Sequence, residues 1–258
     1  MAIELKSETE ITLMRQAGKI VAEVLRILTE RIKPGMKTKD MDVIAEKELK
    51  KMGAESSFKG YRGYPATICV SVNDEIVHGI PGDRVFKEGD IVSLDFGAIY
   101  HGYHGDAAVT VPVGNISPEA RRLIDTTRDT LKVGIAAARP GAKLGDVSAA
   151  IQTYAESNGY SLVREYTGHG IGRRMHEDPQ IPNTTRPPFG LQPGTGPLLK
   201  KGMTLALEPM LNAGGWQTRV ADDQWTVLTA DGSLSAHFEH TIAISDIEPE
   251  VLTGGIYG

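Results

Sequence analysis

The chain has 258 residues, of which 40% are hydrophobic, and a net charge of −5 at pH 7. This composition can build one large domain around a hydrophobic core, and it does not favour nucleic acid as a partner. The single cysteine, Cys69, excludes an internal disulfide. No segment has the apolar core of a signal peptide or the length of a membrane span. We therefore expect a soluble, cytoplasmic protein.

The N-terminal part carries two helix patterns. Ser7 and Glu10 have the spacing of a capping box, and apolar residues then recur at helical intervals up to Leu28. Pro34-Gly35 ends this helix. A second helix is predicted over residues 38–52, where a glycine follows.

After residue 65 the pattern changes to short segments that are typical of strands. Strands are predicted at residues 66–72, 91–96 and 107–113. Ser117-Pro118 then opens another helix, with serine at the cap and proline at the first helical position, and Pro140-Gly141 closes it.

The sequence also contains a repeat. Residues 33–40 resemble residues 139–146, and residues 87–95 resemble residues 200–208. Each half therefore has the order helix, Pro-Gly turn, helix, strands. We predict a single catalytic domain over residues 1–258, built by internal duplication of halves at about 7–113 and 117–245.

Four acidic residues lie on predicted strands whose opposite face is mostly apolar. They are Asp95, Asp106, Glu208 and Glu239. A lone acid of this kind is usually an exposed strand residue. Four acids in paired positions of two halves favour a metal site instead, because buried carboxylates repel one another unless a cation balances them. Carboxylates combined with imidazole suit Mn, Fe, Co or Zn.

One histidine has an unusual frame of glycines. His169 lies in the segment GHGIG, in which glycine permits close approach of the backbone to a ligand. His78 is followed by glycine in a similar local pattern, and His176 follows soon after the GHGIG segment. His101 and His104 lack such a frame, and we interpret them as ordinary surface or structural residues.

Together these segments resemble the type I methionine aminopeptidases of the pita-bread fold. The matching segments run in family order: YRGYP (61–65), SVNDEIVHGIP (71–81), DFG (95–97), GD (105–106), GHGIG (168–172) with HE (176–177), LEP (207–209) and FEHT (238–241). The resemblance implies an α+β protein in which two pseudo-symmetric halves of helices pack on a curved, mainly antiparallel sheet.

The resemblance also implies a two-metal site, with Co, Mn, Fe or Zn as candidate ions. Asp106 and Glu239 would bridge the ions, Asp95 would hold one, and His169 and Glu208 would hold the other. Glu208 would also move a proton, while His78 and His176 would contact the substrate at the scissile amide. The resemblance implies a methionine pocket lined by Tyr61, Tyr64, Cys69, Met175 and Trp225.

The chain departs from the family pattern in four places. Phe58 replaces a smaller residue, often cysteine, and is expected to tighten the pocket. Met175 replaces an aromatic residue. His237 stands where glutamine is usual, close enough to Glu239 to reach the surroundings of the metal site or an adventitious ion. Residues 183–199 form a longer segment than usual, which we interpret as a semi-rigid rim loop.

The expected activity is removal of the initiator methionine from nascent proteins when the second residue is small. The expected partners are nascent polypeptide N-termini, with the ribosome as a candidate place of action. We expect a monomer without membrane or direct nucleic-acid contact. The alternatives are an enzyme like the X-Pro aminopeptidases and prolidases, or a pita-bread binding protein without catalysis.

Overall fold

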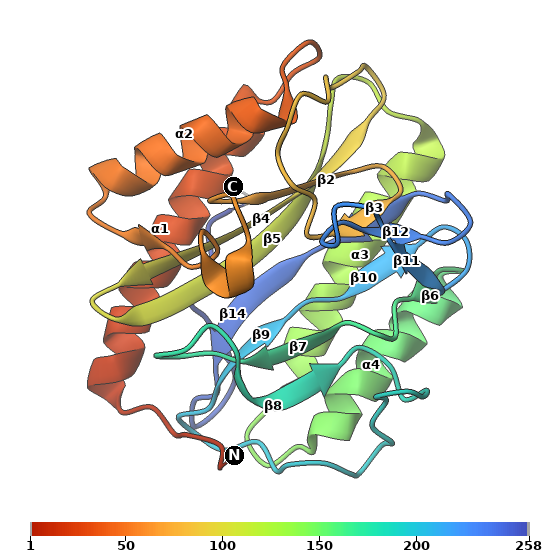
Figure 1. Cartoon of the computed structure of the whole chain (residues 1–258). Coiled ribbons are helices and arrows are strands. Elements are labelled where there is room, and N and C mark those ends of the chain that lie inside the picture. Colours follow the sequence, from red (N-terminus) through yellow and green to blue (C-terminus); the bar gives the residue numbers. More distant parts are fainter. Residues whose placement is uncertain (1, 257–258) are drawn as a thin grey trace.

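The computed structural model describes residues 2–256 and consists of a broad central sheet with helices packed against one of its faces (Figure 1). The helices are α1 (Glu8–Arg31), α2 (Thr38–Lys51), α3 (Pro118–Ala137) and α4 (Leu144–Ser157). No helix of this part of the chain is long and apolar enough to cross a membrane.

The helix starts agree with the sequence signals. Ser7 and Glu10 form the predicted capping box, in which the Ser7 side chain accepts from the Glu10 backbone and the Ser7 backbone donates to the Glu10 carboxylate at 2.9 Å. Ser117 caps α3 by accepting a hydrogen bond from the Ala120 backbone at 3.1 Å. Both predicted caps are therefore confirmed.

The central sheet has nine strands, and its main path runs β1-β4-β5-β14-β9-β7-β8. Its strands are β1 (Glu55–Ser56), β2 (Cys69–Val72), β4 (Ile91–Tyr100), β5 (Tyr103–Pro112), β7 (Thr167–Gly170), β8 (Glu177–Pro182), β9 (Thr204–Leu207), β14 (Glu239–Ala243) and β15 (Glu250–Val251). All neighbouring pairs on this path are antiparallel, so the expected α+β class with a mainly antiparallel sheet is confirmed.

Two small sheets flank the central one. The first contains β6 (Ser161–Leu162), β10 (Met210–Asn212) and β13 (Ser235–His237), and the second contains β3 (Glu75–Val77), β11 (Thr218–Val220) and β12 (Val227–Thr229). A short 3-10 turn, η1 (Tyr61–Gly63), precedes β2.

Strand boundaries differ from the predictions in two places. The predicted strand 66–72 begins only at Cys69, because the backbone N–H of Thr67 donates to the Asp42 side chain at 2.7 Å rather than to a neighbouring strand. The strands predicted at 91–96 and 107–113 are longer and form one hairpin, which turns at His101 (φ 49°) and Gly102 (φ 78°). Histidine is an uncommon residue for this left-handed turn, so the sequence did not signal it.

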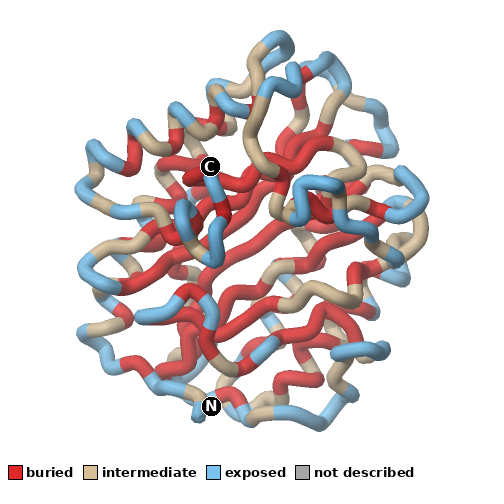
Figure 2. Tube along the Cα trace, in the orientation of Figure 1, coloured by how far each residue is buried: buried red, intermediate tan, exposed pale blue. Residues whose placement is uncertain are grey.

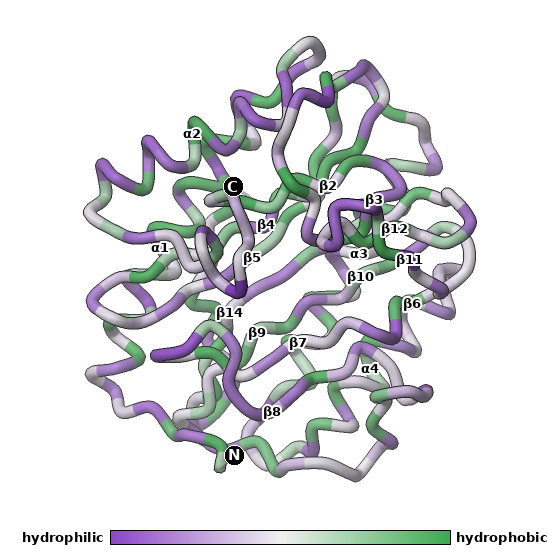
Figure 3. Tube along the Cα trace, in the orientation of Figure 1, coloured by the Kyte–Doolittle hydropathy of each residue, from purple (hydrophilic) through white to green (hydrophobic). Residues whose placement is uncertain are grey.

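The hydrophobic core lies between the central sheet and the helices. Val21 and Leu25 of α1 share a cluster with Leu94 of β4, Leu131 of α3 and Phe238. Figure 2 shows the central strands as buried, and Figure 3 shows hydrophobic residues along them. Because side chains alternate along a strand, the opposite face of the sheet is left for polar residues.

The second helix of each half, α2 or α4, begins in the same manner. The backbone N–H of Lys37 donates to Asp40 at 2.8 Å at the start of α2, and Lys143 donates to Asp146 at 3.1 Å at the start of α4. The two halves meet where β5 pairs with β14 in the middle of the sheet. The duplication itself stays a prediction.

Candidate active site

One cavity of about 160 Å³ brings together every residue that the sequence singled out for the site. Its walls contain the predicted catalytic and metal-binding residues His78, His176, Glu208, Asp95, Asp106, His169 and Glu239, and the predicted pocket residues Tyr61, Tyr64, Cys69, Met175 and Trp225. Phe58 and Arg62 complete the lining.

Strand register explains why the acidic residues meet. Asp95 of β4 and Glu239 of β14 are each paired with Ala108 of β5, which lies between them. Paired residues share a face of the sheet, so the two acids flank one methyl group. Asp106 lies two residues before Ala108 and therefore faces the same side.

The histidine joins this face through a second row of small residues. His169 of β7 is paired with Ala206 of β9, which is paired with Thr241 of β14. Thr241 faces the same side as Glu239, and Glu208 directly follows β9. The candidate ligands thus come from five adjacent strands, β4, β5, β14, β9 and β7.

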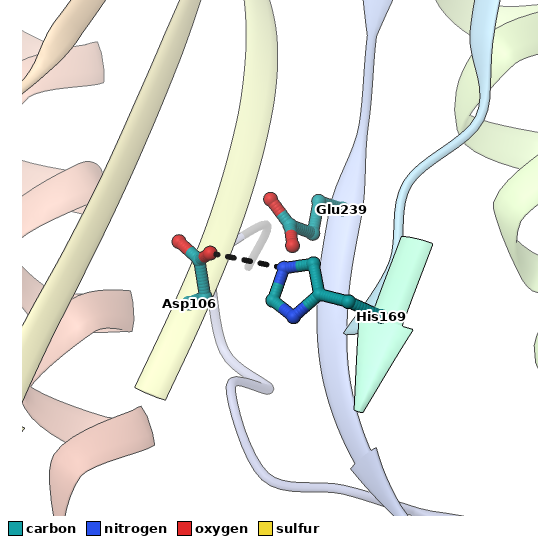
Figure 4. Close-up of side chains that lie close together, drawn as sticks. All are labelled: Asp106, His169 and Glu239. Atoms are coloured by element: carbon teal, nitrogen blue, oxygen red, sulfur yellow. Dashed lines mark ion pairs between the residues drawn. The ribbon is translucent and has the colours of Figure 1, made fainter. Parts of the chain in front are cut away.

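The side chains converge closely. Figure 4 shows Asp106, His169 and Glu239 pointing toward one another, and each offers a ligand atom within 4.8 Å of the others. Nε2 of His169 lies 3.9 Å from Oδ2 of Asp106 and 3.7 Å from Oε1 of Glu208. This separation leaves space for an ion between nitrogen and oxygen atoms.

Burial and mutual repulsion shape the protonation of this cluster. Burial raises the pKa of Asp95 to about 7. Burial and neighbouring carboxylates raise the pKa values of Asp106, Glu208 and Glu239 well above the usual range for carboxyl groups. Burial and the nearby His176 lower the pKa of His169 to about 3. Without a cation, the charged form of each acid is therefore disfavoured.

These residues fit a metal. Among the residues described, Oδ1 of Asp95, Oδ1 of Asp106 and Oε1 of Glu239 are buried without a hydrogen-bond partner. Oxygen atoms of this kind need a proton, a water molecule or a cation. Divalent cations would offset the negative charge of the acids and use the unpartnered oxygens at once.

Two further histidines border the cluster. The ring of His176 lies 4.3 Å from that of His169, and its Nδ1 is 2.9 Å from the Tyr61 hydroxyl. His78 has a positive φ of 62°, which is unusual for a residue with a side chain. Burial lowers the pKa of both His78 and His176 to about 4, so both are neutral at pH 7.

The other end of the cavity is apolar. Tyr64 and Trp225 meet edge to face at 5.1 Å, and the Tyr64 hydroxyl donates to the Gly79 carbonyl at 2.9 Å. Phe58, Cys69 and Met175 pack beside Tyr64. Burial raises the pKa of the Cys69 thiol well above its usual value, so this residue offers a neutral sulfur.

Phe58 has room because of a glycine on the neighbouring strand. A Cβ atom at Gly97 of β4 would come within 2.9 Å of the Phe58 ring. Phe58 is 8% exposed and lines the cavity, and its tightening of the pocket stays a prediction.

His101 and His104, which we interpreted as ordinary residues, do not line the cavity. His104 is buried and pairs with the Ser57 hydroxyl at 2.8 Å, and His101 lies in the exposed hairpin turn. Arg62 also lines the cavity, which was not predicted from the sequence. Its backbone has a positive φ of 49°, which the sequence does not signal.

The segment 183–199 contributes no residue to the cavity wall. It is held against α4, where the Gln152 side-chain oxygen accepts hydrogen bonds from the Thr185 backbone at 2.7 Å and from the Thr184 hydroxyl at 2.8 Å. At its start, the Asn183 amide donates to the Glu208 carbonyl at 3.0 Å. The segment therefore supports the backbone of the site from one side.

Comparison with known proteins adds to this geometry. The model of metallopeptidase family M24 matches residues 12–246. Methionine aminopeptidase 1 of Bacillus subtilis is 53% identical over 96% of this chain and 98% of its own length. The methionine aminopeptidase of Clostridium perfringens is 52% identical over 97% of this chain and 98% of its own length.

Solved structures give the same result for the fold. The methionine aminopeptidase of Thermotoga maritima aligns with a TM-score of 0.95 and 49% identity, covering 98% of this chain and all of that one. The prolidase of Pyrococcus furiosus aligns with a TM-score of 0.78 and 22% identity over 97% of this chain and 65% of that one, which shows a shared fold. The expected pita-bread fold is confirmed.

Proposed function

The chain belongs to metallopeptidase family M24, and we propose that within this family it is a methionine aminopeptidase that removes the initiator methionine from new proteins. One observation carries this proposal. A cluster of metal-competent side chains from five adjacent strands opens into an apolar pocket within the same cavity. The cluster can hold the peptide bond while the pocket holds the first side chain.

We assign two divalent ions to the cluster, and Asp106 and Glu239 would be ligands shared by both. Asp95 would hold one ion, and His169 and Glu208 the other. Bound there, such ions lower the pKa of water and polarise the carbonyl of the bond to be cut. The ligand set does not distinguish among Co, Mn, Fe and Zn.

The remaining chemistry is assigned to the protein's own groups. Glu208 lies at the edge of the cluster with its side chain 15% exposed, so it can take a proton from the attacking water and pass it to the leaving amine. When the Tyr61 hydroxyl donates to Nδ1 of His176, Nε2 of that ring carries the proton. Nε2 can then donate to the oxygen that becomes negative during attack. His78 would hold the scissile amide.

The pocket favours methionine as the first residue. Aromatic faces and the sulfur atoms of Cys69 and Met175 suit an unbranched thioether. A charged side chain would lose its hydration there without a partner. His78 and His176 crowd the space beside the scissile bond, so the second residue of the substrate must be small.

Two alternatives are weighed by the same features. Only the shared fold supports an X-Pro aminopeptidase or prolidase-like activity. The sequences of those structures are about a fifth identical to this chain. A binding protein without catalysis would not need five competent ligand positions. Nascent chains at the ribosome are the proposed physiological substrates.

A peptide panel read by mass spectrometry tests the proposal. The metal-loaded protein is expected to release methionine from Met-Ala, Met-Gly and Met-Ser peptides, with little release from Met-Leu or Met-Lys and none of lysine from Lys-Ala. Efficient cleavage of Lys-Ala, or a preference for X-Pro peptides whatever X is, would refute the methionine assignment. A protein that binds metal and cleaves none of these peptides would favour the binding role.

A further inference from the structure

The imidazole of His237 is buried next to the candidate metal site without hydrogen bonds to any residue described. Its side chain is 1% exposed, and within residues 2–256 neither Nδ1 nor Nε2 has a hydrogen-bond partner. Buried polar atoms are rarely left in this state, because they lose their hydration without compensation. Other buried histidines here are satisfied: Nδ1 of His240 lies 2.8 Å from the Thr253 hydroxyl, and Nδ1 of His104 lies 2.8 Å from that of Ser57.

The backbone of His237 is fixed. Its N–H donates to Oγ1 of Thr110 at 2.8 Å, and its carbonyl accepts from the same hydroxyl at 2.9 Å. Thr110 in turn lies 2.8 Å from the Ser93 hydroxyl. His237 is also the last residue of β13, two residues before Glu239. These hydrogen bonds hold the backbone of His237 in place, so its ring stays beside the site.

The nearest charged group is Glu208. Nε2 of His237 lies 4.0 Å from Oε2 of Glu208, while Oε1 of the same carboxylate lies 3.7 Å from Nε2 of His169. The carboxylate thus stands between two imidazoles, with one oxygen toward each. His169 belongs to the metal-competent cluster, and His237 lies outside it.

We propose that His237 is a positioning residue, which donates a hydrogen bond from Nε2 to Oε2 of Glu208 and directs Oε1 toward the metal. The inference rests on the proposed function, because it presumes that Glu208 is a ligand. The 4.0 Å separation is about 1 Å longer than a hydrogen bond, so the Glu208 carboxylate would have to rotate toward His237 to make it. Carboxylates that bind metals are commonly held by an outer hydrogen bond of this kind, which sets their orientation.

Metal binding to the chelated protein tests the proposal without relying on activity. Calorimetric titration with Mn²⁺ compares the wild type with His237→Leu, which removes the donor while keeping an apolar side chain, and with His237→Gln, which restores an N–H donor. We expect the leucine variant to bind the metal roughly 10- to 100-fold more weakly, the range for loss of an outer partner of a ligand. The glutamine variant is expected to recover most of the affinity.

The absorption spectrum of the Co²⁺-loaded protein gives a second readout, because it reports the coordination of the ion. His237→Leu is expected to change it and His237→Gln to restore it. His240→Leu is the matched control: it removes a buried histidine of β14, the next strand along the chain, and is expected to keep both affinity and spectrum. Circular dichroism establishes that each variant is folded, and His237→Asn, whose amide is too short to reach, replaces the leucine variant if that one is not.

The outcomes separate this inference from the proposed function. Equal affinity and identical spectra for wild type and His237→Leu would overturn the inference, as would equal losses in the leucine and glutamine variants, which indicate packing alone. In Glu208→Ala, which has no side-chain oxygen for His237 to hold, the His237→Leu change should have no further effect on affinity. Failure of the wild type to release methionine would refute the proposed function, while the affinity differences would still decide the role of His237.

Discussion

The protonation and hydrogen bonding of Asp106 are set by the residues around it. Its Oδ1 is buried without a hydrogen-bond partner among the residues described, and burial, together with the charges of Asp95 and Glu208, raises its pKa. His78 lines the same cavity but carries no charge at neutral pH and contacts Tyr166 and Trp225 through its ring. The two residues should therefore fail in different ways when removed.

Asp106→Ala is expected to lose metal and activity together, because it deletes a proposed bridge between two ions. His78→Ala is expected to keep the metal and lose turnover by roughly a hundredfold, the scale for one group that stabilises the transition state. Elemental analysis and methionine release from Met-Ala peptides measure both effects. If Asp106→Ala kept the wild-type metal content, the bridging assignment would be wrong.

At the scale of elements, the start of α1 is tied to the sheet and to the loop that carries His176. Glu10 closes the capping box and also accepts from the Tyr103 hydroxyl of β5 at 2.6 Å. Just before the helix, the buried ammonium group of Lys6 pairs with the buried carboxylate of Glu177, the residue after His176. The N-terminal segment thus supports one wall of the site.

Glu10 makes this arrangement dependent on pH. The Tyr103 hydroxyl and the Ser7 backbone lower the pKa of Glu10 from 4.5 to about 2. Its contribution to stability is therefore present above pH 4.5 and disappears as the pH falls toward 2. Glu10→Gln keeps the capping hydrogen bonds but removes the charge, so it should lower the free energy of unfolding at pH 6 by roughly 0.3–1 kcal/mol, the range for a charge near a helix N-terminus.

Urea unfolding of chelated wild type and Glu10→Gln from pH 6 to pH 3 measures this difference. The gap between the two proteins should stay constant down to about pH 5 and shrink from there to pH 3, and chelation prevents release of metal from contributing. A gap that stays constant down to pH 3 would contradict the role of the carboxylate charge.

For the whole molecule, the site connects the two halves. Asp95 and Asp106 come from the N-terminal half, and His169, Glu208 and Glu239 come from the C-terminal half, across the junction of β5 and β14. Any ion held by residues of both halves is lost when either half unfolds. Metal should therefore stabilise the entire fold.

Thermal unfolding should reveal this coupling. At a free metal concentration 100 times the dissociation constant, the native state gains about 2.7 kcal/mol. For a protein of this size, that corresponds to a rise in Tm of roughly 5–10 °C. Asp106→Ala should show no such rise, whereas an equal rise in that variant would indicate metal binding elsewhere.

Sequence signals alone predicted the helices and several strands of the central sheet, and they proposed the residues of the candidate site. Caps such as Ser7 and Ser117 and the alternation around Asp95 are local signals, which need only neighbouring residues to be recognised. The matching segments then identified the residues that share the cavity, although each was separated from the next by long stretches of chain.

Which side chains come into contact depends on the packing of distant segments. The pairing of β5 with β14 places Ala108 between Asp95 and Glu239, and no local pattern specifies this register. The left-handed backbone that turns Arg62 to the cavity mouth and the 4.0 Å approach of His237 to Glu208 likewise depend on packing between distant segments. Periodicity assigns a side chain to a face of its own strand, whereas the distance between two side chains is fixed by how the strands are ordered and aligned in the sheet.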